Sequence, residues 1–250
     1  MINLEEIKSR WEPLLAKADW YLTIVPEIDE IKKGLKGKSE AEQDYCKKEL
    51  YDFFELHLKN GGIALEQNPP NTDVERKSID TIIIHHTSNP PGMSKERLSG
   101  MELMRLYSPY FYNPKIEADV SMKGKPIYSG HFRNEQQVFW PYHWFVRKDG
   151  DIERLLEDTE IGWQAGNWDI NCRSAAICFD GDYENSRPSD TELRAVANII
   201  KKYYPSVSKE RIFGHREINL KTTCPSNLFL SDDGRRGWKE DLLALVNEIN

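Results

Sequence analysis

Residues 79–86, with the sequence IDTIIIHH, decide the fold of the longer part of this chain. The β-branched run before His85 and His86 is typical of a largely buried strand, and the two histidines follow at its C-terminal end. A rigid strand delivers the side chains at its end to the rim of a sheet, where catalytic residues tend to lie. The run therefore predicts a buried strand with a functional site at its end.

Strands and helices are mixed in the rest of this region. Helices are expected at residues 95–107, from Ser189 onward, and at 238–249. Residues 108–141, rich in Pro, Gly and Tyr, predict a long irregular excursion with short strands. Further strands are expected at residues 142–147, 152–156, 175–179 and 211–213. The pattern is typical of the α/β or α+β class, and we predict an α/β fold with a mixed central β-sheet flanked by helices.

The N-terminal part has a different character. Apolar residues recur at helical spacing between residues 3 and 60, and Lys and Glu cover the other face. The sequence Asn-Pro-Pro-Asn at 68–71 is a strong break. We therefore predict a helical N-terminal extension at 1–68 and a second domain at 69–250. The apolar stripes of the extension need a partner surface, so these helices either pack on the main domain or dock a partner.

Composition excludes several classes of function. The chain of 250 residues has 34 basic and 41 acidic residues, so nucleic acid is not expected as its main partner. No apolar run approaches the roughly 20 residues that span a bilayer. The start MINLEEIK shows no secretory signal, which predicts synthesis in the cytoplasm. Action inside the cell, release through a separate pore and export by another route all stay open.

Two histidines and one cysteine are candidate metal ligands. His85 follows the first strand, His215 follows the strand at 211–213, and Cys224 comes nine residues after His215. Such a set matches the borderline softness of zinc, and three protein ligands leave a fourth position for water. The alternative is packed histidines and a buried thiol. Neither His-Glu-x-x-His nor Gly-x-Ser-x-Gly is present, which disfavours the commonest zinc protease and serine hydrolase sites.

Several short motifs carry a family resemblance. They occur in one order: Ile84-His-His-Thr87, Tyr142-His-Trp144, Gly162-Trp-Gln-Ala-Gly-Asn167, Gly214-His-Arg-Glu217 and Cys224-Pro225. Each motif alone is weakly specific, but the ordered set resembles the N-acetylmuramoyl-L-alanine amidase family, which includes peptidoglycan recognition proteins and amidase-type phage lysozymes. The resemblance covers roughly residues 78 to 245.

The resemblance implies a catalytic centre. One zinc ion would be held by His85, His215 and Cys224, and Tyr142 matches the catalytic tyrosine of the family. The implied reaction is hydrolysis of the amide that joins the lactyl group of N-acetylmuramic acid to L-alanine of the stem peptide, so the expected partners are peptidoglycan or muropeptide fragments. Thr222 is favoured by register for contacting the oxyanion, with Lys221 as the alternative.

Substrate contacts are expected from residues within these motifs. Trp144 and Trp163 have flat rings that suit glycan faces and stem-peptide methyl groups, although either could belong to the core. Asn167 is assigned to substrate binding with them. Arg216 is expected either to pair with a stem-peptide carboxylate or to form a structural ion pair.

The chain also departs from the family. Gln164 stands where relatives often have histidine, and Cys178 stands where some intracellular relatives use glutamate. Two other functions therefore stay in view: a module that binds peptidoglycan without cutting it, and a zinc peptidase that cuts another stem-peptide bond. Loss of the cysteine ligand usually marks non-catalytic members, so the presence of Cys224 together with Tyr142 favours the enzyme.

Overall fold

The computed structural model describes residues 3–113, 122–232 and 234–248, which form two compact units. The first unit comprises Met1–Asn71 and Glu96–Phe139, and the second comprises Thr72–Lys95 and Trp140–Asn250. The chain thus leaves the first unit close to the predicted boundary. It returns to that unit for residues 96–139, which the sequence predicts as part of the second domain.

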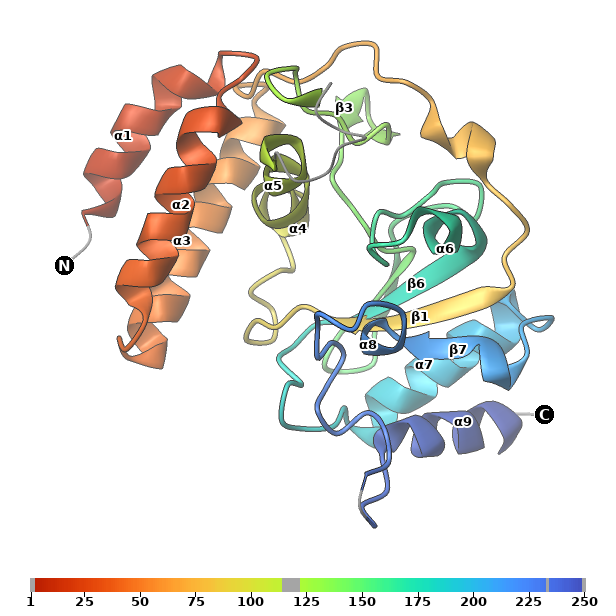
Figure 1. The fold of residues 1–250 in the computed structure, drawn as a ribbon. Helices are drawn as coiled ribbons and strands as arrows, with labels where there is room; N and C mark the ends of the chain where they lie inside the picture. Colours follow the sequence, from red (N-terminus) through yellow and green to blue (C-terminus); the bar gives the residue numbers. More distant parts are fainter. Residues whose placement is uncertain (1–2, 114–121, 233, 249–250) are drawn as a thin grey trace. The chain divides into compact units, whose positions relative to one another are not determined.

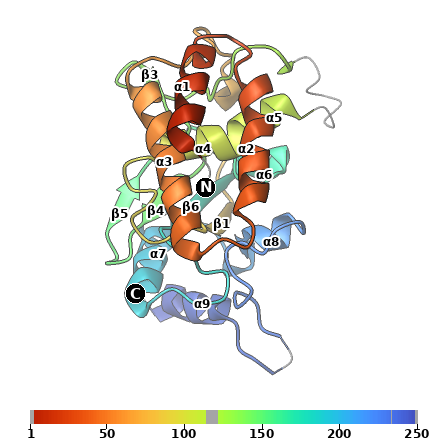
Figure 2. The same cartoon turned by 90° about the vertical axis from the view of Figure 1, so that its left-hand side faces the viewer.

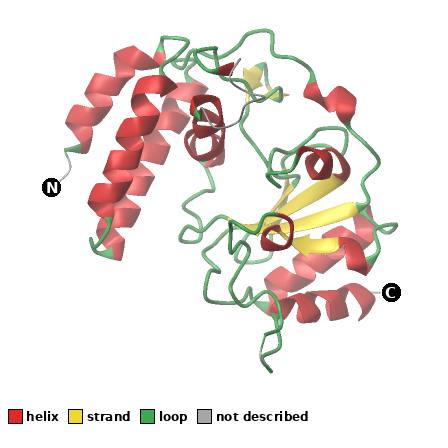
Figure 3. Cartoon of the chain, viewed as in Figure 1, coloured by secondary structure: helices red, strands yellow, loops and turns green. Residues whose placement is uncertain are grey.

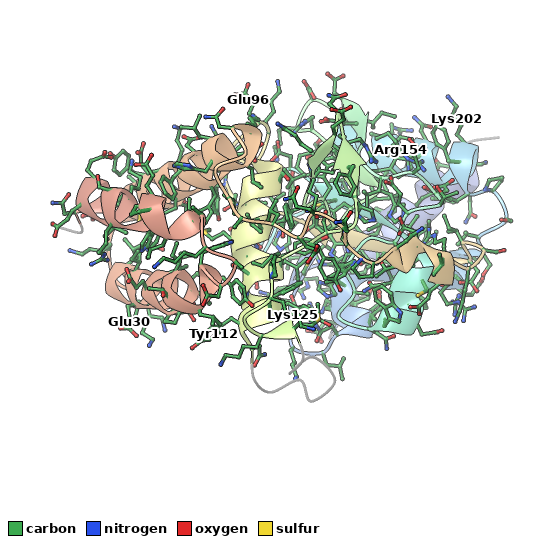
Figure 4. The ribbon with its side chains drawn as sticks, turned by 90° about the horizontal axis from the view of Figure 1, so that it is seen from above. Glu30, Glu96, Tyr112, Lys125, Arg154 and Lys202 are labelled. Atoms are coloured by element: carbon green, nitrogen blue, oxygen red, sulfur yellow. The ribbon has the colours of Figure 1, made fainter. Side chains whose placement is uncertain are left out.

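The first unit is built on three helices that lie side by side (Figures 1 and 2). They are α1 (Leu4–Leu15), α2 (Tyr21–Leu35) and α3 (Glu40–Lys59). Their apolar faces meet around buried aromatic rings, among them Trp11, Trp20 and Phe54. Charged side chains such as Glu30 of α2 point outward (Figure 4). The amphipathic pattern of residues 3–60 is therefore explained by packing within this unit.

The returning segment packs on these helices through a close approach of backbones. It forms α4 (Leu98–Glu102), the π-helical turn η2 (Leu103–Tyr107) and α5 (Ser108–Tyr112), followed by the short strands β2 (Phe132–Arg133) and β3 (Gln136–Gln137). A Cβ on Gly100 would lie 2.5 Å from the backbone nitrogen of Glu55 in α3, and the Glu55 carboxylate accepts a hydrogen bond from the Gly100 N–H. Part of the predicted irregular excursion, residues 114–121, lies outside the described residues.

The second unit contains the predicted mixed sheet, with strand order β5-β4-β6-β1-β7. Strands β4, β6, β1 and β7 run parallel, and β5 pairs antiparallel with β4. The strands are β1 (Thr81–His86), β4 (Trp144–Val146), β5 (Ile152–Arg154), β6 (Ser174–Phe179) and β7 (Ile212–Gly214). Both histidines of the first motif belong to the end of β1 itself.

Helices cover this sheet (Figure 3). Helices α7 (Asp190–Tyr203) and α9 (Trp238–Glu248) pack on the face that carries Ile82 and Ile84 and complete the main apolar core there. The other elements are η1 (Thr72–Glu75), α6 (Trp168–Arg173), η4 (Lys209–Arg211) and α8 (His215–Ile218). Because side chains alternate along a strand, Ile83 and His85 point to the opposite face. No helix of the described residues is long and apolar enough to cross a bilayer.

Candidate metal centre

Strand register brings His85 and His215 together. Ile84 of β1 pairs with Gly214 of β7 in parallel register. The next residues along the two strands, His85 and His215, therefore lie side by side at the same edge of the sheet. The two imidazole rings lie with their centroids 4.7 Å apart. Adjacent parallel strands therefore place two histidines, distant in sequence, at a single point.

Cys224 reaches this point on the loop after α8. The loop is tied back to Arg216, whose backbone N–H donates to the Cys224 carbonyl at 2.7 Å. It also depends on Gly214, because a Cβ there would lie 2.5 Å from the Phe229 ring and 2.7 Å from Cδ of Pro225. Glycine thus permits the close approach that delivers the thiol.

The three donors converge. One side-chain donor atom from each of His85, His215 and Cys224 lies within 4.8 Å of the others, and the described part of the chain contains no second such group. Sγ of Cys224 lies 3.7 Å from Nδ1 of His85. Zn–N bonds of 2.0–2.1 Å and a Zn–S bond of 2.3 Å at tetrahedral angles would separate nitrogen from sulfur by about 3.6 Å. The observed spacing fits such a site.

The side chain of Gln164 hydrogen-bonds the ring nitrogen of His85 that faces away from Cys224. Nε2 of His85 lies 2.5 Å from Oε1 of Gln164, and Nε2 of Gln164 donates to the Ser174 hydroxyl at 2.9 Å. The amide oxygen can only accept a hydrogen bond, so the proton of the neutral ring lies on Nε2 of His85. The lone pair of Nδ1 then points toward Cys224.

His215 is held in a similar way by the next residue of the same segment. The backbone of Ala165 hydrogen-bonds the His215 imidazole. Nε2 of His215 is buried and has no hydrogen-bond partner among the described residues. The ring is therefore anchored on one side and presents a buried nitrogen on the other, and a bound metal ion would satisfy that atom.

Both imidazoles are neutral near pH 7. Burial lowers the pKa of His85 well below its usual value, and the neighbouring His215 lowers it further. Burial likewise lowers the pKa of His215 to about 4, against the opposing effect of the hydrogen bond to Ala165. Neutral imidazole is the form that binds a metal ion, so burial prepares both side chains for this role.

Tyr142 and Thr222 lie beside these donors. The Tyr142 ring packs against the His85 ring with centroids 5.1 Å apart. Oγ1 of Thr222 accepts a hydrogen bond from the backbone N–H of Cys224 at 3.1 Å, and Lys221 is exposed. Gly162 allows the backbone just before Tyr142 to pack closely, because a Cβ at position 162 would lie 2.2 Å from the carbonyl oxygen of Pro141.

Trp144 lies away from this group. It pairs with Ile177 in register, as Ile84 does, so its side chain shares the face of Ile84 and not that of His85. The indole is 4% exposed, and its Nε1–H donates to the Tyr204 hydroxyl at 2.7 Å. This is the placement of a core residue, and it does not support the substrate contact expected for Trp144.

The other expected substrate residues lie on the segments that surround the donors. Trp163 is half-buried and meets Trp168 edge to face at 6.1 Å. Asn167 is exposed, and its side chain caps α6 by accepting from Ile170 N at 3.2 Å. Arg216 donates to the Ser226 carbonyl at 2.8 Å, so its guanidinium also braces the loop that carries Cys224.

The remaining polar residues of the motifs have structural partners. Nδ1 of His86 accepts from the Tyr183 N–H at 2.9 Å, and Nδ1 of His143 accepts from the Ala176 N–H at 3.2 Å. Cys178 pairs with His85 in register but is not part of the donor group. Asn171, whose side chain accepts hydrogen bonds from the backbone of Gln164 and Ala165, is not predicted as a site residue by the sequence. Nothing in its sequence context signals that contact.

Comparison with known proteins places this site in a family. A family model described as N-acetylmuramoyl-L-alanine amidase matches residues 75–227, more than half of the chain. The 1,6-anhydro-N-acetylmuramyl-L-alanine amidase AmpD of Haemophilus influenzae is 26% identical over 153 residues, which cover 58% of this chain and 74% of that protein. The chain therefore belongs to the N-acetylmuramoyl-L-alanine amidase family and is a peptidoglycan amidase.

Solved structures of similar proteins were also found. The N-acetylmuramoyl-L-alanine amidase endolysin LysCS from Clostridium intestinale matches with a TM-score of 0.46 and 17% identity, covering 72% of this chain and 90% of that one. The Ph2119 endolysin from a Thermus scotoductus bacteriophage matches with a TM-score of 0.43 and 19% identity, covering 68% and 86%. Drosophila peptidoglycan recognition protein SD matches with a TM-score of 0.40 and 17% identity, covering 65% and 83%.

Proposed function

We propose that this chain uses one zinc ion, held by His85, His215 and Cys224, to hydrolyse the amide between N-acetylmuramic acid and L-alanine of the stem peptide. The observation that carries the proposal is the convergence of two imidazoles and one thiol within 4.8 Å in a member of this amidase family. Every residue assigned to the site lies in the second unit, which supports a catalytic role for that unit.

The donor set suits zinc in particular. Two imidazoles and a thiolate match the borderline softness of this ion, and three protein ligands leave a fourth position for water or substrate. The buried Nε2 of His215, which has no hydrogen-bond partner in the part of the chain that the structure describes, supports the fit. When bound, zinc supplies Lewis acidity that lowers the pKa of water toward about 7 and polarises an amide carbonyl.

Tyr142 and Thr222 would stabilise the charge that develops on the carbonyl oxygen. Tyr142 is 8% exposed and packs on His85, so its phenol can donate a hydrogen bond in a site largely shielded from water. The Thr222 hydroxyl accepts from Cys224 N and can still donate its own proton to the same oxygen. Donors fixed before the reaction stabilise the transition state without the cost of reorganisation.

The outer residues would hold the substrate. Trp163 directly precedes Gln164 and Ala165, which anchor the histidines, and it forms an aromatic pair with Trp168, which is 38% exposed. Such rings suit the apolar faces of sugars and the methyl groups of a peptide. Asn167, exposed between them, can add a polar contact from its side-chain N–H groups. Arg216 has donors beyond the one that binds Ser226, and these suit a stem-peptide carboxylate.

Two alternatives differ in chemistry. A non-catalytic binding module would have no need of Tyr142 beside a buried donor group, so the packing of Tyr142 on His85 favours the enzyme. A peptidase acting on another stem-peptide bond would use the same centre, and only the cleaved bond separates it from the amidase.

Digestion of a defined muropeptide, followed by mass spectrometry, tests the proposal. The expected products are the free stem peptide beginning with L-alanine and the intact muramic acid moiety. Activity should disappear with a chelator and return with added zinc. Cleavage inside the stem peptide would replace the amidase with the peptidase. Binding without cleavage by the zinc-loaded protein would leave only the binding module.

A further inference from the structure

We propose that Asn171 is a positioning residue that orients both histidine ligands through the single segment Gln164–Ala165. This inference rests on the proposed zinc site. The Asn171 side chain forms its hydrogen bonds with backbone N–H groups of this segment. It acts on the polypeptide that in turn holds the two imidazoles.

The first step is the contact between Asn171 and this segment. Its Oδ1 accepts the backbone N–H of Gln164 at 3.2 Å and that of Ala165 at 2.8 Å. One carbonyl oxygen therefore fixes two consecutive peptide groups. The Asn171 side chain is buried, with 6% exposure, so water cannot readily replace these bonds.

The second step is what the two fixed residues do. The side-chain oxygen of Gln164 accepts from Nε2 of His85 at 2.5 Å, whereas the backbone of Ala165 hydrogen-bonds His215. Neighbouring residues thus serve the two different imidazoles. A rotation or shift of the segment would disturb the tautomer and direction of both rings at once.

The third step is the support of Asn171 itself. It lies on α6, whose first turn is capped by Asn167. At the other end of the helix, the guanidinium of Arg76 donates to the carbonyl oxygens of Asn171, at 3.0 Å, and Ser174, at 2.9 Å. Ser174 also accepts the side-chain N–H of Gln164. Asn167 therefore caps the start of this short helix, and Arg76 holds its end where it meets β6. The side-chain amide of Asn171 is thereby fixed in place.

The neutral amide of Gln164 has a chemical consequence. A carboxylate in contact with His85 would raise the basicity of the imidazole, whereas the Gln164 amide fixes the tautomer without adding charge. Gln164 thus sets the direction of the His85 ring, and the charge of the site would come from the Cys224 thiolate and a bound metal ion.

The test compares Asn171→Leu with Asn171→Asp. Leucine has similar size but no acceptor, while aspartate keeps an acceptor oxygen at the same place. Zinc affinity of the folded variants, measured by competition with a chelator, should be about 10- to 100-fold weaker for Asn171→Leu. Asn171→Asp should recover most of that loss. Asn247→Leu, an exposed substitution of the same kind on α9, serves as the control and should leave the affinity unchanged.

A spectroscopic readout separates positioning from simple destabilisation. Cobalt(II) bound in place of zinc reports the geometry of its ligands through its visible absorption. We expect Asn171→Leu to shift and weaken these bands even where circular dichroism shows the protein to be folded. A thermal shift with an unchanged cobalt spectrum and unchanged zinc affinity would overturn the inference.

A double variant tests the route of action. If Asn171 acts through Gln164, the losses of zinc affinity caused by Asn171→Leu and Gln164→Leu should be less than additive. Fully additive losses would contradict the route. Wild-type protein that binds no zinc would refute the proposed function and this inference together, whereas tight zinc binding that Asn171→Leu leaves intact would refute the inference alone.

Discussion

Sγ of Cys224 lies 3.7 Å from Nδ1 of His85, although 139 positions separate the two residues in the chain. Nδ1 of His85 lies at the end of strand β1, and Sγ of Cys224 lies on a loop in the C-terminal part of the chain. A metal ion shared by these atoms would cross-link distant parts of the second unit. Binding would therefore contribute to stability as well as to chemistry.

Cys224→Ser should remove both contributions. A serine hydroxyl is a far weaker zinc ligand than a thiolate, so we expect zinc loss and loss of most amidase activity. We also expect that added zinc no longer raises the melting temperature. Elemental analysis and a thermal scan with and without zinc check this. A variant that retains zinc and turnover would remove Cys224 from the ligand set.

Tyr142→Phe should separate metal binding from catalysis. The ring still packs on His85, but the hydroxyl donor is gone. Loss of one such donor typically lowers kcat on the order of 10²–10³-fold. Zinc content and KM should stay close to those of the wild-type protein. Unchanged kcat in the zinc-loaded variant would refute the role of the phenol.

Trp144→Phe and Trp163→Ala should have opposite signatures. Trp144→Phe removes the buried hydrogen bond to Tyr204 and leaves a small cavity, so the free energy of unfolding should fall by about 1–3 kcal/mol. Its KM should not change, because the ring lies on the face opposite His85. Trp163→Ala should raise KM for muropeptide with little effect on stability. A raised KM in Trp144→Phe, with an unchanged KM in Trp163→Ala, would contradict the assignment of Trp144 to the core and of Trp163 to substrate binding.

Glu102 predicts a pH dependence of stability in the first unit. Its side chain is buried in α4, Oε1 has no hydrogen-bond partner among the described residues, and burial raises the pKa of the carboxyl against the effect of Arg105. A raised pKa in the folded state favours the protonated form. The contribution of Glu102 to the free energy of unfolding is therefore fully present below the pKa of the unfolded state, near 4.5. It is lost as the pH rises through the pKa of the folded state.

Glu102→Gln keeps a neutral side chain at every pH. We expect this variant to be more stable than the wild-type protein at pH 8, with a difference that shrinks toward pH 4.5. Urea unfolding at the two pH values measures it. A difference that does not depend on pH would show that Glu102 does not titrate in this way.

Much of this site follows from sequence pattern, because strand ends and residue chemistry are local properties. The β-branched run before His85 predicts one buried strand, and the short apolar run before His215 predicts another. The face on which Trp144 lies could not be predicted, since the strand begins only at residue 144 and the backbone before it follows no simple alternation. The sheet register that decides this exists only after folding.

Two other features escaped prediction for similar reasons. The segment 96–139 returns to the first unit because Gly100 fits against α3, a contact between parts of the chain that carry no mutual signal. Asn171 looks like an ordinary polar residue of a short helix, and its role comes from two backbone groups that the fold brings to it.

X-ray absorption at the zinc edge of the purified wild-type protein tests the central claim most directly. The account predicts one zinc ion per chain with two nitrogen ligands at about 2.0–2.1 Å and one sulfur ligand at about 2.3 Å. A further light-atom ligand would fill the fourth position. A zinc ion without sulfur in its coordination shell, or protein that takes up no zinc, would contradict it.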